Sequence, residues 1–159
     1  MQKDFQNIRR LTLAATKNDG AYYYFARRLH INENTLTLLY ALGDGQAHSQ
    51  KQVCDDWLLP KTTVSTNVRE LREAGYLELE PLENTREKAL VLTDAGKAFA
   101  ETVLQPLYRA EQAAMEKTLA RFSPEFIDAF QYFAACFQTE IFSQAGTDEE
   151  QKKKGKKKL

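Results

Sequence analysis

Residues 57–77 read WLLPKTTVSTNVRELREAGYL, and this stretch carries the strongest structural signal in the chain. Proline is tolerated in the first turn of a helix but ends the segment before it, so a new helix is predicted to begin at Pro60 or Lys61. It is predicted to run to Ala74 and to close at Gly75, because glycine readily adopts the left-handed conformation found after many helices. Two short helices joined by a tight turn are typical of a helix-turn-helix motif.

The segments before this motif also read as helices. Apolar spacing predicts helix from Phe5 to Ala15, an interruption at Asn18-Asp19-Gly20 and helix again over residues 21–30. A second helix over residues 35–42 is expected to end at a Gly-Asp-Gly turn. The candidate caps of that helix are Asn32 and Asn34. Ser49 is expected to cap a short third helix that buries Val53 and Trp57.

Beyond Gly75 the apolar period changes from helical to alternating, which predicts a β-hairpin. Its strands contain Leu77 and Leu79 on one side and residues 89–92 on the other. Thr93 is expected to cap a helix that is interrupted or bent near Pro106. A last helix is expected to begin at Ser123-Pro124-Glu125. It carries more apolar surface than one face of a small monomer needs, in Phe122, Phe126, Phe130, Phe133, Phe137 and Ile141.

The helix after Pro60 has two different faces. At 100° per residue, Val64, Val68 and Leu71 share one face and must point inward. The opposite face is small, polar and weakly basic, with Lys61, Thr62, Ser65, Thr66 and Arg69. Such a face can approach a major groove closely, and Arg69 can bind a guanine or a phosphate. The hairpin that follows has Arg86 and Lys88 at its tip, as in the winged form of the motif.

Together, WLLPKTTVSTNVRELREAGYL (57–77) and ENTREKALVLTDAGKAF (83–99) resemble the MarR family of winged-helix bacterial transcriptional regulators. The resemblance spans about residues 31–101. It implies DNA contacts on the recognition helix and the wing, at Lys61, Thr62, Thr63, Ser65, Thr66, Asn67, Arg69 and Arg86. The family usually has an aspartate that braces the wing at the position of Asn84.

The expected architecture is mainly α with a small β-hairpin, in a single domain over residues 1–145. The winged helix-turn-helix occupies residues 31–101, and the resemblance implies a dimerisation lobe formed by helices in residues 1–30 and 105–143. Residues 146–159 are expected to be a disordered, lysine-rich tail. Six of the 22 basic residues lie in that tail, so residues 1–151 hold 16 basic and 22 acidic residues, a net charge of −6.

The expected function is a sequence-specific DNA-binding transcriptional regulator, a repressor that binds an inverted repeat of double-stranded DNA as a homodimer. The resemblance also implies release by a small aromatic ligand, for which Tyr22, Tyr24 and Arg28 could supply rings and a cation. The alternative for these aromatics is interface core. The negative body and the acidic hairpin leave a second function open, a winged-helix module that binds protein and lacks specific DNA binding.

Catalysis is not expected. His48, Cys54 and Asp55 or Asp56 form the one cluster with nucleophile, base and acid types, but no glycine-loop or oxyanion motif accompanies them. Two cysteines and two histidines offer no structural zinc site, so neither metal nor cofactor is expected. Cys136 is expected to be a small buried apolar residue, and redox sensing stays open. The absence of a signal or a membrane-length apolar run favours the cytoplasm.

Overall fold

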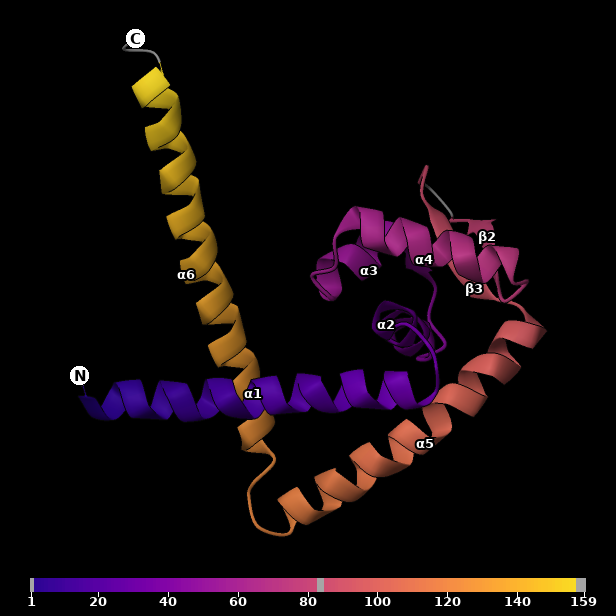
Figure 1. Ribbon diagram of the computed structural model, residues 1–159, viewed down its shortest axis with the longest axis horizontal. Coiled ribbons are helices and arrows are strands. Elements are labelled where there is room, and N and C mark those ends of the chain that lie inside the picture. The colour runs from indigo at the N-terminus through magenta and orange to yellow at the C-terminus, as the bar shows by residue number, and fades with distance from the viewer. Residues whose placement is uncertain (1, 83–84, 157–159) are drawn as a thin grey trace. The chain divides into compact units, whose positions relative to one another are not determined.

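The computed structural model describes residues 2–82 and 85–156, and the chain forms two compact units, Met1–Ala110 and Glu111–Leu159. The fold is mainly helical with a small antiparallel sheet, as predicted. Figure 1 shows α3, α4 and the β2–β3 hairpin gathered together in the first unit. The elements are α1 (Gln2–Arg28), α2 (Glu33–Leu42), β1 (His48–Ser49), α3 (Gln50–Asp56), α4 (Lys61–Glu73), β2 (Leu77–Pro81), β3 (Lys88–Leu92), α5 (Asp94–Leu119) and α6 (Glu125–Lys156).

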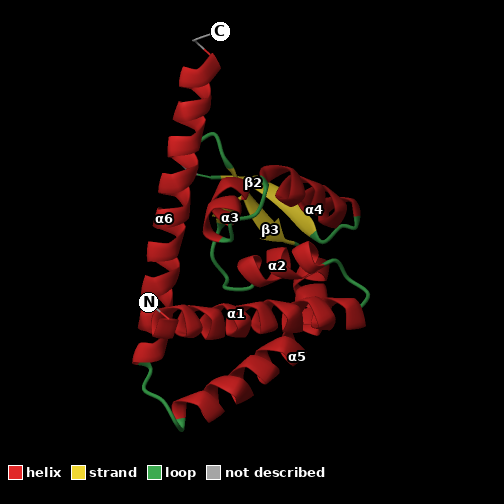
Figure 2. Cartoon of the chain, turned by 60° about the vertical axis from the view of Figure 1, so that its left-hand side comes forward, coloured by secondary structure: helices red, strands yellow, loops and turns green. Residues whose placement is uncertain are grey.

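The sheet has the order β1-β3-β2 with both pairs antiparallel. The predicted hairpin is confirmed, with Leu79 opposite Leu90 in the register. Strand β1 is an addition that the sequence did not reveal, because two residues are too few to show an alternating pattern. It pairs His48 with Leu90 and Ser49 with Ala89. In Figure 2 the strands, in yellow, lie beside α3 and α4.

The helix ends follow the predicted capping chemistry. Asn32 caps α2 by accepting from the amide of Asn34. Ser49 and Gln52 form a reciprocal capping box at the start of α3, with both hydrogen bonds present. The Thr93 hydroxyl accepts from the amide of Gly96 at the start of α5. Gly75 has a φ of +75°, the left-handed conformation expected after α4.

The core lies in the first unit and is built mainly from α2, α4, the first half of α5 and the sheet. The inward face predicted for α4 is confirmed, because Val64, Val68 and Leu71 are all buried. They pack in one cluster with Leu36 and Leu39 of α2. Burying several such side chains at about 25 cal/mol per Å² of apolar surface anchors α4 by one face and leaves its other face to solvent.

Three local expectations were wrong, and one was half right. Helix α1 runs without interruption through Asn18-Asp19-Gly20, because a glycine inside a helix costs only about 1 kcal/mol. Helix α5 continues through Pro106, so of the two outcomes expected there, an interruption or a bend, the interruption is absent. Trp57 is not buried but 42% exposed, since it forms the C-cap of α3. Cys136 is exposed on α6.

Helix α6 begins where the sequence predicted, directly after Ser123-Pro124. It continues to Lys156 and so includes residues 146–156, for which a disordered tail was expected. The reason is the same as for α1: Gly146 and Gly155 weaken a helix without breaking it, and no proline follows Pro124. Its aromatic side chains Phe126, Phe130 and Phe137 are exposed. None of the helices in the described part of the chain has an apolar stretch of the length that a bilayer requires.

Candidate nucleic-acid interface

The outer face of α4 is polar and open to solvent. Of the residues expected to contact DNA, those exposed on α4 are Lys61, Thr62, Ser65, Thr66 and Arg69, while Thr63 is half-buried. The guanidinium of Arg69 is 4.0 Å from the carboxylate of Glu73, and both side chains are about two-thirds exposed. An exposed pair of this kind contributes little to stability, so Arg69 is available to bind another anion.

Asn67 lies elsewhere than expected. Only 4% of it is exposed. Its side-chain amide donates to the carbonyl of Thr63, and its side-chain oxygen accepts from the hydroxyl of Thr35 on α2. The polar pattern of the sequence placed Asn67 among the DNA contacts, but a buried amide with both ends satisfied is a structural link. Asn67 therefore joins α4 to α2 through its side chain.

The N-terminus of α4 has no side-chain cap, because Pro60 occupies the cap position. The first intrahelical bond runs from the amide of Val64 to the carbonyl of Pro60. The amides of the first turn therefore lack an intrahelical partner, and the helix dipole adds partial positive charge there. Such an end suits a phosphate, and Lys61 adds a full charge at the same place.

Lysines from three separate elements meet beside this helix end. A pocket of about 630 Å³ is lined by Lys51 of α3, Lys61 of α4 and Lys88 of β3. Two acids, Asp55 and Glu87, line it as well. The sequence indicated Lys61 and Lys88 but missed Lys51, which sits on an otherwise unremarked turn of α3. One signal in the sequence could have indicated Lys51. It lies two residues after the Ser49 cap, in the first turn of a helix, where a positive charge is unfavourable for the helix and therefore points to another role.

The wing carries mixed charge. Arg86 and Lys88 are exposed, and so are the acids Glu78 and Glu80 on β2. The amide of Glu87 donates to the hydroxyl of Thr85, which closes one side of the tip. Asn84, the position where the resemblance predicts an aspartate brace, lies outside the described residues.

The three residues expected to bind an effector are not brought together. Tyr22 is half-buried against the core and lines a pocket with Tyr40 and Trp57. Tyr24 is 74% exposed, and Arg28 is exposed as well, and neither lines that pocket. Consecutive helical residues point in different directions, which separates Tyr22 from the other two.

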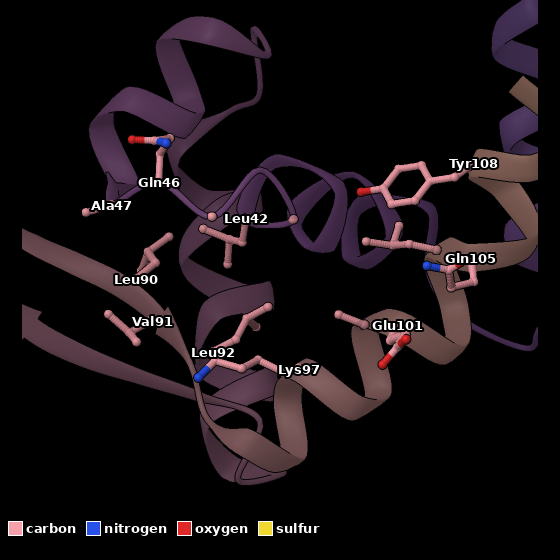
Figure 3. A pocket seen from close by; sticks show the side chains of 14 residues that line it. Leu42, Gln46, Ala47, Leu90, Val91, Leu92, Lys97, Glu101, Gln105 and Tyr108 are labelled. Carbon is pink, nitrogen blue, oxygen red and sulfur yellow. The ribbon is translucent and has the colours of Figure 1, made fainter. Parts of the chain in front are cut away.

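A further pocket of about 500 Å³ lies between the end of α2, β3 and α5. Its floor is apolar, with Leu42, Leu90 and Leu92 (Figure 3). Lys97 and Tyr108 of α5 contribute polar groups to its edge. Lys97 lies 3.3 Å from Asp94 in an exposed pair, and Glu101 of the same helix also lines the pocket, so the edge carries both signs of charge.

Cys54 is a poor candidate for a redox switch. Burial raises the pKa of its thiol, the neighbouring carboxylate of Asp55 raises it further, and Lys61 opposes both effects. Because the thiolate is the reactive form, Cys54 holds less of it than a free cysteine at any pH below the raised pKa.

We therefore expect Cys54 to react with iodoacetamide several-fold more slowly than the exposed Cys136 at mildly alkaline pH. The rates are measured separately in Cys136→Ser and Cys54→Ser chains. Asp55→Asn should accelerate the reaction of Cys54, since it removes a charge that disfavours the thiolate. Faster alkylation of Cys54 than of Cys136 would contradict this account.

Comparison with known proteins agrees with this geometry. Residues 31–86 match the MarR family model. A MarR family regulator from Neisseria meningitidis is similar in structure, with a TM-score of 0.66 and 26% sequence identity. The match covers 91% of this chain and 99% of that protein's chain. A MarR family transcriptional regulator from Listeria monocytogenes, solved with a 26mer DNA, covers 84% of this chain and 87% of its own at 17% identity and a TM-score of 0.60. No curated protein matches.

Proposed function

Because residues 31–86 match the MarR family model and the chain has a winged-helix fold, we propose that it is a transcriptional regulator that binds double-stranded DNA in a sequence-specific manner and represses transcription. Helix α4 enters the major groove, and the β2–β3 hairpin lies along the neighbouring minor groove. The alternative function, a protein-binding winged helix without specific DNA binding, is an outcome of the experiment below.

The observation that carries this proposal is the outer face of α4. It combines short hydroxyl side chains, which allow close approach, with Arg69, and its opposite face is anchored in the core. The contacts are assigned to Lys61, Thr62, Thr63, Ser65, Thr66 and Arg69, and on the wing to Arg86 and Lys88. Asn67 helps to hold α4 in position through its hydrogen bonds to Thr35 of α2 and Thr63 of α4. Lys51 adds a phosphate contact from α3.

The proposal includes a homodimer on an inverted repeat. One recognition helix reads only a short segment, and a two-fold dimer places two helices about one helical turn apart on the same side of the duplex. Support comes from helices outside the winged helix, which expose large apolar side chains. They include Phe5 and Ile8 on α1, and Phe130, Phe137 and Phe142 on α6. A monomer seldom leaves so many large apolar side chains in water.

A small aromatic effector is also part of the proposal. Of the residues expected to bind it, Tyr22 lines the pocket shared with Tyr40 and Trp57, and Tyr24 and Arg28 do not line that pocket. The effector would act by favouring dimers in which the two recognition helices are wrongly spaced for the operator.

Selection of bound sequences from random duplex DNA tests the function, with the full chain at physiological salt. The expected result is an enriched inverted repeat whose half-sites are about 10 base pairs apart, centre to centre. Sedimentation of the complex should show two chains per duplex. A chain truncated after Gly146 should select the same sequence with weaker non-specific binding, because it loses six lysines. If no sequence is enriched, the protein-binding module is favoured instead.

A further inference from the structure

A pocket of about 540 Å³ lies between α1, α2 and the turn that joins α3 to α4. Three aromatic residues line it: Tyr22 of α1, Tyr40 of α2 and Trp57 at the end of α3. The rings of Tyr40 and Trp57 meet edge to face, with centroids 5.6 Å apart and planes 70° apart. Its volume is typical of a small-molecule site, and we call it the aromatic pocket.

The position of Trp57 is unusual for a residue of its size. It is 42% exposed although a buried tryptophan would stabilise the fold. The next residue, Leu58, has a φ of +49°, in the left-handed region that a leucine rarely adopts. Leu58 lies between two residues of the pocket lining, Trp57 and Leu59. Backbone strain of this kind gathers at binding sites, where it holds side chains in place.

The charge of the aromatic pocket is negative. Asp19 of α1 and Glu33 of α2 line it, and no lysine, arginine or histidine appears among its described lining residues. Within the described part of the chain, neither carboxylate takes part in an ion pair. Both acids are exposed where they line the pocket, so their carboxylates are open to an entering ligand.

We propose that the aromatic pocket binds a small organic cation, such as an aromatic quaternary ammonium compound. The face of an aromatic ring carries negative electrostatic potential and attracts a cation, most strongly in tryptophan. The two carboxylates add Coulomb attraction, whereas an aromatic acid would meet two like charges and no cation. The proposed ligand is therefore positively charged, whereas Arg28 in the sequence suggested a negatively charged one.

Such a ligand would also reach the recognition helix, a consequence that rests on the proposed function. Trp57 and Leu59 stand directly before α4, which begins at Lys61. On the other side of the pocket, α2 is joined to α4 by the Thr35–Asn67 hydrogen bond. A cation between α2 and the turn therefore binds best to one placement of α4 and shifts the population towards it.

Trp57 provides a direct test, because it is the one tryptophan of the chain. The full chain is titrated with benzyltrimethylammonium, and separately with 3-phenylpropionate as an anion of similar size, at constant ionic strength. We expect the cation to change the fluorescence of Trp57 with a dissociation constant about tenfold lower than that of the anion. Equal binding of the two probes, or no change with the cation, would overturn the proposal.

Variants locate the binding. The double change Asp19→Asn and Glu33→Gln should weaken the cation about tenfold, and both positions are exposed, so the fold should be kept. The matched control is Glu73→Gln with Glu78→Gln, two exposed acids outside the pocket, which should leave the affinity unchanged. If the control weakens binding as much as the double change does, the cation is held by general charge and the site is wrong.

A third measurement separates this inference from the proposed function. Affinity for the selected DNA is compared with and without saturating benzyltrimethylammonium, and we expect a change of at least about fivefold. Cation binding without that change would refute the coupling and keep the site. Failure to bind any DNA would refute the proposed function and leave the fluorescence result standing.

Discussion

Gly96→Ala is expected to lower the free energy of unfolding by about 3 kcal/mol, because the added methyl group has no space. A Cβ at Gly96 would overlap the carbonyl oxygen of Tyr76 and lie 2.8 Å from its carbonyl carbon. Both are backbone atoms, so no side-chain rotation relieves the contact. The same carbonyl accepts from the amide of Thr93, which holds it in place at 3.1 Å.

The site of this contact is the base of the wing. The hydroxyl of Thr93 donates to the carbonyl of Gly75 at 2.7 Å and accepts from the amide of Gly96, so three backbone segments meet there. Chemical denaturation followed by circular dichroism measures the loss. The matched control is Gly20→Ala in α1, where a Cβ meets nothing within 4 Å and helix propensity predicts a gain of about 0.5–1 kcal/mol. A Gly96→Ala chain as stable as the wild type would show that α5 can move away from Tyr76 at little cost.

Arg69→Ala is expected to weaken binding to the selected DNA sequence about 10- to 100-fold, the range for the loss of a good arginine–guanine contact. Arg69 is the one arginine on the outer face of α4 in the described chain, and its present partner is the exposed Glu73. The loss should be smaller on random DNA, because a base contact adds nothing there. Equilibrium binding on both kinds of duplex, repeated at several salt concentrations, measures the difference.

The control for Arg69 is Arg72→Ala. Arg72 is exposed in the last turn of the same helix, so the charge removed is equal and its position along the helix differs. We expect Arg72→Ala to leave sequence preference unchanged. Equal losses from the two variants would mean that α4 contributes only positive charge, and the assignment of Arg69 as a base contact would be wrong.

Features determined by neighbouring residues were predictable from the sequence. The caps at Ser49 and Thr93 and the left-handed Gly75 depend on groups within three residues, so composition and spacing were sufficient. The inward face of α4 followed from helical periodicity alone. The MarR resemblance then placed these elements in the correct order, and the fold and the family match confirm it.

Features that depend on distant residues were not predictable. The pairing of β1 with β3 joins positions about 40 residues apart, and no local sequence pattern in either strand indicates which strand it pairs with. The hydrogen bond between Asn67 and Thr35 joins residues 32 positions apart, so the sequence did not show this link and the resemblance placed Asn67 among the DNA contacts. The aromatic pocket draws its lining from three segments, so the acids Asp19 and Glu33 carried no signal in the sequence.

Ser49 has two roles that connect the wing to the helix before the recognition helix. It pairs with Ala89 in the sheet, and its hydroxyl caps α3. When the base of the wing is displaced, the capped end of α3 must follow it, so the two move as one rigid unit. We therefore expect the paired part of the wing, from Leu77 and Leu92 to Pro81 and Lys88, to move together with the start of α3. Amide hydrogen exchange should show slow exchange for the amides of the β2–β3 ladder between the Leu77–Leu92 and Pro81–Lys88 pairs.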